Sequence, residues 1–511
     1  MATRASFLES IELSSVPRAA VRDSPFGSPL SSPALSRKPS YESLSAAAWA
    51  PTLDKISTTP PIDQREDQNS RLRRLSMTEP TDDTDVQELL PVDKGKGAWG
   101  FVVAAFILDW GFSYCYASVL VYFQSHEPWS GYSLAALSAV GTVQLALEFV
   151  LPLFVINFFR RYPDKVKLSL VISAAVYSGS MLLASWATSV WHLVLLQGVL
   201  CGASGAVLYA PVLLWLNGWF LTKRGLASGI VFSGTGAGGF AFPFLIGKLL
   251  DDFGFAWMCR IWAFITAAVF AVSIVFLQPR IPLRKPVGPR PKWFLIDRKT
   301  VSHPLVFTMA VTTFISSLAY FPVSLYLPTY AVSLLDSEDP FKPNLVVGIF
   351  NAAAMLGSNL TGYASDKSNP WTVSTIGVIG GVVALSAWGA ADTLGKVFGF
   401  AVLYGASSQI CSCWGPCARD VAGANPQTST TITCLWGIVR GVASLVGPFV
   451  STSLYEKHQA KSSEPEWGRF GFARIIVFVG CMSFASSLGG VALGYLRRRM
   501  AAQKQLGSSG A

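Results

Sequence analysis

From Trp99 to Tyr495 the chain consists of long apolar stretches, each close to the length of a helix that crosses a lipid bilayer. A helix needs about 20 mostly apolar residues to span about 30 Å of hydrocarbon. Charged residues make up only 14% of the chain, whereas soluble domains carry about 25%. The sequence therefore predicts an all-α integral membrane protein, with lipid as the solvent for most of the chain.

The apolar stretches predict twelve transmembrane helices in two six-helix halves. The longest internal linker, at 278–303, is rich in Lys and Arg and separates a half at 96–277 from a half at 304–496. A short tail, 497–511, follows the second half. The expected spans are 98–124, 131–158, 168–188, 191–218, 226–247, 257–277, 304–330, 344–364, 371–391, 396–416, 428–452 and 472–495.

Residues 1–95 differ from the rest because they are rich in Ser, Pro and Thr and lack apolar periodicity. Such a segment buries too little surface to offset its chain entropy, so we expect a disordered tail. The runs Arg37-Lys-Pro-Ser40 and Arg73-Arg-Leu-Ser76 resemble substrates of basophilic kinases. A kinase is therefore a candidate partner of the tail, although Arg close to Ser is also common in disordered segments.

The distribution of Lys and Arg predicts the orientation. Basic residues gather in alternate loops, in the central linker and in Arg497-Arg498-Arg499, while the opposite loops are diluted by acids. By the positive-inside rule, both termini face the cytoplasm. The net charge of +10 is thus explained by topology, and no nucleic-acid partner is expected. We expect a multi-pass protein of the plasma membrane, with a vacuolar or other endomembrane location as the alternative.

Several function classes lack their sequence signals. The chain has no Gly-xxxx-Gly-Lys-Ser/Thr loop for ATP, and no cofactor is predicted. Cys413 and Cys417 share a helical face, but no His or carboxylate accompanies them, so we expect free thiols and no metal site. An integral membrane enzyme would need clustered His or paired carboxylates at one membrane face. We predict no such cluster, and therefore no enzyme.

Two halves joined by a basic linker are typical of an alternating-access carrier with its substrate site near the membrane midplane. Glycines open and continue the fifth span, where Gly225/Gly229 and Gly234/Gly238 are pairs of small residues four positions apart. Such pairs let helix backbones approach closely. The spacing fits static packing and sliding equally well. A non-transporting nutrient sensor with the same fold is the alternative function.

Three runs resemble monocarboxylate transporters of the major facilitator superfamily, in their fungal style. They are Gly97-Ala-Trp99-Gly100-Phe101, Trp219-Phe-Leu-Thr-Lys-Arg224-Gly-Leu-Ala-Ser-Gly229 and Gly357-Ser-Asn-Leu-Thr-Gly362-Tyr-Ala-Ser-Asp366-Lys367. The resemblance implies the major facilitator fold, alternating access and a cytoplasmic gating loop at Gly362, Asp366 and Lys367. It also implies a small-molecule substrate of the organic-anion type.

The sequence departs from the proton-coupled animal branch of that family. Ser118, Ala354 and Ser358 stand where that branch has a lysine and an Asp/Arg pair. We therefore expect a substrate other than lactate, either a monocarboxylate-like organic anion or a hydrophobic secondary metabolite. The sequence predicts no direction of transport, so uptake and efflux are equal alternatives.

Ionised groups inside a membrane are costly, so each is a functional candidate. Arg440 is the candidate anion ligand, because arginine binds carboxylates through two parallel hydrogen bonds; its alternative is a pair with a protein carboxylate or with helix-terminal carbonyls. Asp109 and Glu148 are candidates for proton coupling. Their alternatives are a hydrogen bond near a helix break at Gly111 for Asp109, and a structural ion pair for Glu148.

Uncharged polar side chains within the spans complete the candidate substrate site. They offer hydroxyl and amide groups to a bound molecule, and the alternative for each is packing or contact with lipid. The candidates are Tyr114, Tyr209, Tyr320, Asn351 and Gln409.

Overall fold

The computed structural model describes residues 90–112, 116–281, 298–335, 341–456 and 467–509. The chain divides into two compact units, Met1–Val86 and Gln87–Ala511, and every described residue belongs to the second. The tail through residue 89 with its kinase-like runs, Tyr114, and most of the basic linker (282–297) lie outside the described residues.

The described residues form helices and turns without a strand, which confirms the predicted all-α class. The helices before the central linker, called the first half below, are α3 (Lys96–Phe112), α4 (Tyr116–Ser125), α5 (Leu134–Val150), α6 (Pro152–Arg161), η1 (Pro163–Lys165), α7 (Val166–Ala184), α8 (Val190–Leu193), η2 (Val194–Leu200), α9 (Cys201–Trp219) and α10 (Arg224–Phe276). Those after it, called the second half, are α11 (Arg298–Val301), α12 (Pro304–Leu335), α13 (Phe341–Val383), η3 (Ala384–Trp388), α14 (Leu394–Ser407), η4 (Ile410–Cys413), α15 (Trp414–Ala422), α16 (Pro426–Leu454) and α17 (Ala473–Ser509).

Eight helical segments of the described chain are long and apolar enough to cross a membrane, or nine if the pair α5 and α6, bent by 41°, is one span. The two longest of the eight each contain a break within a single helix. Helix α10 has 53 residues and breaks at Gly254 (φ 73°, ψ 174°), a left-handed φ that glycine adopts without strain. Helix α13 breaks at Ser368 (φ −153°, ψ 87°).

These breaks divide α10 and α13 into arms of membrane-spanning length. Without a break, a helix as long as α10 would measure about 80 Å, far more than the hydrocarbon thickness. The arms fall in the predicted spans 226–247, 257–277, 344–364 and 371–391, and α3 and α4 share the first predicted span. All twelve predicted ranges thus contain helix, while the number of membrane crossings stays a prediction.

Each half has its own apolar core. The first-half core includes Trp262 and Phe270, and the second-half cores include Trp388 and Trp436, all fully buried. Large apolar side chains also lie on the outside, and Phe264 and Phe449 are 71% and 73% exposed. An outer surface of this kind is stable against lipid and would be unfavourable in water.

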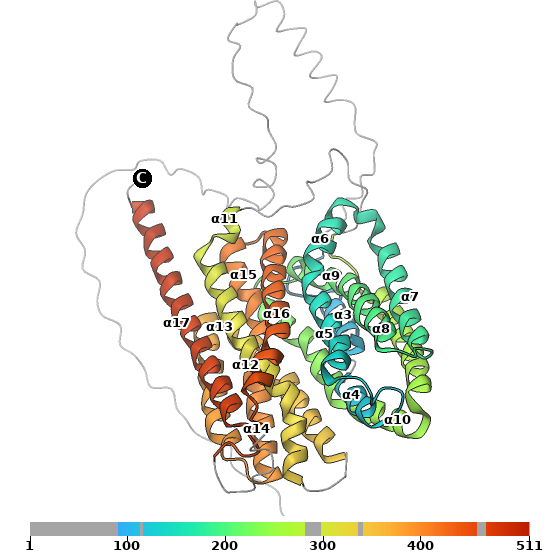
Figure 1. Cartoon of the computed structure of the whole chain (residues 1–511). Coiled ribbons are helices and arrows are strands. Elements are labelled where there is room, and N and C mark those ends of the chain that lie inside the picture. The colour runs from blue at the N-terminus through green and yellow to red at the C-terminus, as the bar shows by residue number, and fades with distance from the viewer. Residues whose placement is uncertain (1–89, 113–115, 282–297, 336–340, 457–466, 510–511) are drawn as a thin grey trace, which may run out of the picture. The chain divides into compact units, whose positions relative to one another are not determined.

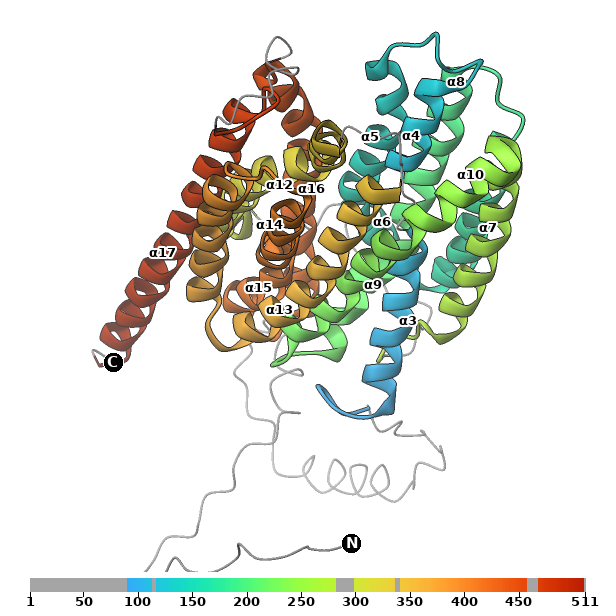
Figure 2. The same cartoon turned by 90° about the horizontal axis from the view of Figure 1, so that it is seen from below.

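The two halves lie side by side, with α3–α10 drawn in blue to green and α12–α17 in yellow to red (Figures 1 and 2). The first arm of α10 packs against α13 along the boundary between them. At one end of the bundle, basic side chains of both halves come together, and we call this end the basic face. It is defined by Arg160, Arg224, Lys367, Arg419 and Arg497.

Candidate functional site

A cavity of about 530 Å³ lies between the two halves, within the size range of pockets for drug-sized ligands. Its wall includes every candidate for substrate binding or proton coupling except Tyr114, which is outside the described residues. The candidates that line it are Asp109, Glu148, Tyr209, Tyr320, Asn351, Gln409 and Arg440.

Asp109 lies on α3 and binds the first arm of α10. Its Oδ2 accepts hydrogen bonds from the backbone N–H of Thr235 at 2.9 Å and from Thr235 Oγ1 at 2.5 Å. Gly111 lies in the last turn of α3, which ends at Phe112, and a Cβ on Gly111 would come within 2.7 Å of Val269 Cγ1. The carboxyl is therefore fixed by a neighbouring helix, at the wall of the cavity.

Glu148 lies on α5 and accepts a hydrogen bond from Gln144 Nε2 at 3.1 Å. The expected alternative of a structural ion pair is not found, since Glu148 pairs with no cation of the described chain. Both carboxyls thus belong to the first-half wall of the cavity, and each accepts a hydrogen bond from a neutral donor.

Arg440 lies on α16 and carries the positive charge of the opposite wall. Its guanidinium carbon lies 5.1, 5.3 and 5.7 Å from the ring centroids of Tyr320, Phe321 and Phe149, respectively. Nη1 donates to Ser317 Oγ at 3.2 Å. Among the described residues no carboxylate lies within ion-pair distance of Arg440. The predicted alternative of a protein carboxylate partner is therefore not found in the described chain.

Two other arginines that lie far from the basic face are not part of the cavity wall. Arg474 pairs with Glu456 at 2.7 Å. Arg260 lies 5.0 Å from the ring centroids of both Trp186 and Trp257 and donates to Ser185 Oγ. Arg440 alone of these three lines the cavity.

The amide candidates also serve the local structure. Asn351 Nδ2 donates to the carbonyl oxygens of Gly239 and Val347, both at 3.1 Å, and so joins α13 to α10. Gln409 Nε2 donates to the carbonyl oxygen of Gly405 at 3.1 Å, just beyond the end of α14. Both amides line the cavity with part of their side chains.

On the basic face, the turn at 220–223 and the start of α10 are held by both halves. Asp366 of α13 accepts hydrogen bonds from the backbone N–H groups of Gly225 and Leu226, both at 2.8 Å. A carboxylate in this position satisfies unpaired N–H groups and opposes the helix dipole. Lys367, the neighbouring candidate, is exposed, and its Nζ lies 4.4 Å from the ring centroid of Tyr363.

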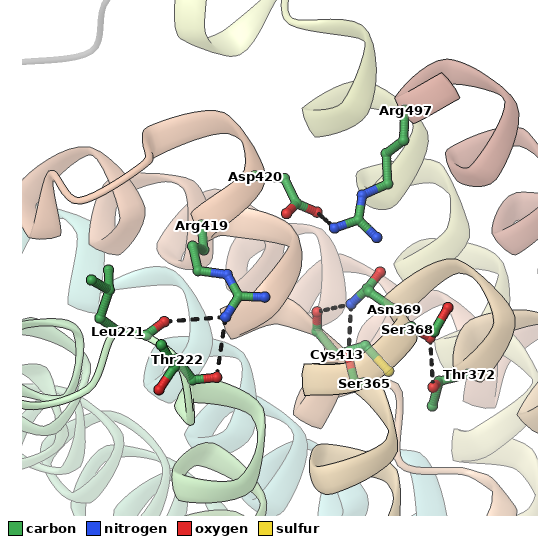
Figure 3. Close-up of polar contacts among 10 residues, drawn as sticks. All are labelled: Leu221, Thr222, Ser365, Ser368, Asn369, Thr372, Cys413, Arg419, Asp420 and Arg497. Atoms are coloured by element: carbon green, nitrogen blue, oxygen red, sulfur yellow. Dashed lines mark hydrogen bonds and ion pairs between the residues drawn. The ribbon is translucent and has the colours of Figure 1, made fainter. Parts of the chain in front are cut away.

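Arg419 of α15 holds the carbonyl side of the same turn. Its Nη1 donates to the carbonyl oxygens of Leu221 at 3.2 Å and Thr222 at 3.1 Å (Figure 3). The next residue, Asp420, pairs with Arg497 of α17 (Figure 3). Two consecutive residues of α15 thus connect the first half to the C-terminal helix.

Side chains inside the bundle form further hydrogen bonds between the two halves. Arg224 is 1% exposed and donates to Ser429 Oγ at 3.1 Å. Asn217 Nδ2 donates to Thr430 Oγ1 at 3.1 Å, and Arg160 donates to Thr431 Oγ1 at 3.2 Å. We call this set of hydrogen bonds, together with those of Asp366 and Arg419, the latch. It closes the cavity toward the basic face.

The candidate glycines lie on two contacts of α10. A Cβ on Gly225 or Gly229 would come closer than 3.0 Å to a carbonyl oxygen of α13, and the same holds for a Cβ on Gly362 against Gly225. Gly234 instead faces α3, where a Cβ would lie 2.5 Å from the carbonyl oxygen of Phe106. Gly238 is buried. One stripe of glycines therefore serves both a contact within the first half and the contact between halves.

The segment before α3 also binds the turn at 220–223. The Asp93 carboxylate accepts from the backbone N–H groups of Leu221, Thr222 and Lys223 at 2.9–3.1 Å, and from Thr222 Oγ1 at 2.9 Å. Partial burial acts to raise the pKa of Asp93, but these hydrogen bonds outweigh it and hold the pKa below 3.8. Asp93 belongs to the first half, so this clamp does not depend on the position of the second half.

Replacing Asp93 with alanine is expected to destabilise the protein by about 1 kcal/mol, a value reduced for partial exposure. Because the pKa is lowered by folding, the contribution is fully present above pH 3.8 and is lost as the pH falls through the lower folded value. The melting temperatures of wild type and Asp93→Ala should therefore differ by more at pH 7 than at pH 3. An equal difference at both pH values would contradict the clamp. Lys94→Ala, at an exposed neighbour, is the control.

Several residues of the site are missed by sequence reasoning. Thr235, Phe149 and Phe321 look like ordinary span residues, and nothing local marks them as partners of Asp109 or Arg440. Asn217 carries a usable signal, because it is a polar side chain inside an apolar span. The role of Asp93 has no such signal, because it depends on a turn 128 residues later in the chain.

Metal and redox chemistry have no support among the residues the structure describes. No group of three or more His, Cys, Asp or Glu side chains lies close enough there to hold a metal ion. Cys413 and Cys417 are buried free thiols, as are Cys201, Cys259 and Cys434.

Comparison with known proteins agrees with this architecture. The family profile of the Major Facilitator Superfamily matches residues 101–448. The chain is 29% identical over 321 residues to MFS-type transporter 1 of an Ophiocordyceps species, covering 62% of this chain and 69% of the relative. It is 28% identical to the fujikurins efflux protein of Gibberella fujikuroi (62% and 68% covered) and 26% identical to an aspyridones efflux protein of Emericella nidulans (78% and 79% covered).

The family profile covers more than half of the chain and includes both cavity walls and the whole latch. The helical architecture, the cavity between two halves and this match lead to one conclusion. The chain belongs to the major facilitator superfamily.

Proposed function

We propose that the protein is a secondary transporter that moves an organic anion across a membrane by alternating access. The single observation that supports this most is Arg440, an arginine in a cavity between two halves, without a carboxylate partner among the described residues. A guanidinium in such a site is costly unless an anion compensates it. The bound substrate is the anion we propose.

Alternating access requires that the two ends of the cavity close in turn. The latch closes the basic face, and the positive-inside rule assigns that face to the cytoplasm. We therefore interpret the conformation as closed toward the cytoplasm. In the other conformation the contacts of Asp366 and Arg419 break, while Asp93 continues to cap the turn of its own half.

Efflux of a secondary metabolite is the direction we favour. Two relatives are named as efflux proteins for fujikurins and aspyridones, and the cavity is larger than a two- or three-carbon acid requires. A monocarboxylate-like substrate is the narrower version of the proposal. We propose that the protein lies in the plasma membrane, where efflux would export the metabolite from the cell.

The test is transport by the purified full-length chain in proteoliposomes. Vesicles loaded with a fluorescent aromatic carboxylate should exchange it with external unlabelled carboxylate, and vesicles without protein should not. Saturable binding with no exchange would contradict transport and favour the non-transporting sensor. The direction follows from a comparison of metabolites inside and outside cells with and without the gene.

Asp109→Asn should remove the pH dependence of transport. Asparagine keeps an oxygen that accepts from Thr235 N–H and Oγ1, so the fold is preserved, but it cannot carry a proton. Flux of wild type should change with an imposed pH gradient, whereas flux of Asp109→Asn should not. Glu148→Gln is the matched variant on the same wall. If Asp109→Asn keeps the full response and Glu148→Gln loses it, Glu148 carries the proton instead.

A further inference from the structure

At the end of the cavity nearest the basic face lies a layer of aromatic side chains that come from both halves. Phe232 of α10 and Trp414 of α15 lie with their ring centroids 6.5 Å apart and their planes at 86°. Trp414 is 4% exposed, and its Nε1 donates to Thr313 Oγ1 at 3.1 Å. The ring is therefore held in place by the second half. We call Phe232, Trp414 and Leu213 the floor.

The floor is one layer thick. Beneath it lies a second void of about 20 Å³, room for about one water molecule. Phe232, Trp414 and Leu213 line both spaces, together with Tyr209, Cys411 and Thr433. The far side of the void touches Ser228 and Asn217, and Asn217 belongs to the latch. The floor thus separates the substrate cavity from the contacts that hold the basic face closed.

Arg440 and the floor offer a bound molecule different groups. Arg440 is surrounded by aromatic faces, so an anion bound there also meets flat apolar surface. The floor offers apolar rings whose own hydrogen-bonding group, Trp414 Nε1, is already used. A ligand that satisfies both regions carries one ionised group and a sizeable apolar body.

We propose that the substrate is an amphipathic organic acid whose ionised group binds Arg440 and whose apolar body lies on the floor. The floor then sets the length of acid that the site accepts. This inference rests on the proposed function and names its substrate class. It also gives Phe232 and Trp414 the role of specificity-determining residues.

The test measures binding to the full-length protein in nanodiscs, with empty nanodiscs subtracted. The probes are acetate, benzoate and 4-phenylbenzoate, each with its primary amide. The Kd should fall at least tenfold at each step of the acid series, because each step buries more apolar area at about 25 cal/mol per Å². Each amide should bind at least tenfold more weakly than its acid. Equal Kd values along the series, or equal binding of acids and amides, would overturn the proposal.

Variants of the floor test its role in selection. Phe232→Ala should reduce the preference for 4-phenylbenzoate over benzoate at least fivefold, and Phe232→Leu should do so to a smaller extent if the alanine variant folds poorly. Phe240→Ala, on the same helix but 43% exposed and outside the cavity wall, should keep the wild-type preference. An unchanged preference in Phe232→Leu and Trp414→Phe would remove the floor from selection. Size-dependent binding without flux would contradict transport alone, and flux without size dependence would contradict this inference alone.

Discussion

Replacing Arg440 with glutamine is expected to lower anion flux about 100-fold. A charge-assisted hydrogen bond contributes about 1.5–3 kcal/mol, and the upper value corresponds to a factor of about 100 in binding or rate. Glutamine removes the charge but keeps a polar side chain. The only side-chain hydrogen bond of Arg440 in the described chain is the one to Ser317, so the local fold should be preserved. Flux of a labelled aromatic carboxylate in proteoliposomes is the measurement.

The expected loss is large because the site offers a substrate anion no second cation of its own. Arg440 is the only Lys or Arg that lines the cavity among the described residues. The aromatic rings of Phe149, Tyr320 and Phe321 surround the half-buried guanidinium with a less polar medium than water, in which its attraction for an anion is stronger. Arg440→Lys keeps the charge but loses the planar fork, so its flux should fall between wild type and Arg440→Gln.

Arg474→Gln is the matched control, because it removes an arginine from α17 whose side chain is 65% exposed and paired with Glu456. Its flux should stay within a factor of two of wild type. Wild-type flux in Arg440→Gln would remove Arg440 from the substrate site. Equal losses in both arginine variants would show that general destabilisation is responsible, which monodispersity and the melting temperature would report independently.

Adding a single methyl group at Gly229 is expected to keep the two halves from closing at the basic face. The Cβ of Gly229→Ala would come within 3.0 Å of the Ser358 carbonyl, which belongs to helix backbone and cannot rotate away. Overpacking of this kind costs about 1–3 kcal/mol. Because only the closed conformation contains the contact, the equilibrium should move toward the open one by a factor of about 5–150.

Distances across the basic face should report this shift. Spin labels at Lys165→Cys in the first half and Lys367→Cys in the second, both exposed positions, should give a longer distance distribution in Gly229→Ala. Transport should fall at the same time, because the cycle needs both conformations. Gly362→Ala, which meets the backbone of Gly225 from the opposite side, should have the same effect.

Gly179→Ala is the matched control, because a Cβ at that glycine of α7 meets nothing within 4 Å. It should leave distances and flux unchanged. If Gly229→Ala also gives the wild-type distance distribution, the glycine contact does not control closure, and the stripe serves static packing alone.

The helical spans could be predicted from the sequence because the length of an apolar stretch is a local property. Every predicted range contains helix, and even the long helices α10 and α13 break close to the predicted boundaries. The cavity candidates could also be chosen from the sequence. Charged and amide side chains are rare within apolar spans, and the cost of exposing them to lipid directs them inward.

The partners of those side chains could not be predicted, because they depend on the register between helices. Asp109 meets Thr235 across 126 residues of chain, and Arg440 meets Phe149 from the other half. The glycines of α10 were visible as a pattern, yet only the packing shows that Gly229 faces α13 whereas Gly234 faces α3.

The sequence by itself determined the helices, their apolar surfaces and the few polar groups inside, since each follows from the solvation of a residue and its near neighbours. Only the tertiary structure decided which end of the cavity is closed. Asp93, Asp366 and Arg419 come from three distant parts of the chain to one turn, and the hydrogen bonds of Asp366 and Arg419 form only when both halves meet there. Contacts of that kind depend on three-dimensional proximity, which local pattern does not encode.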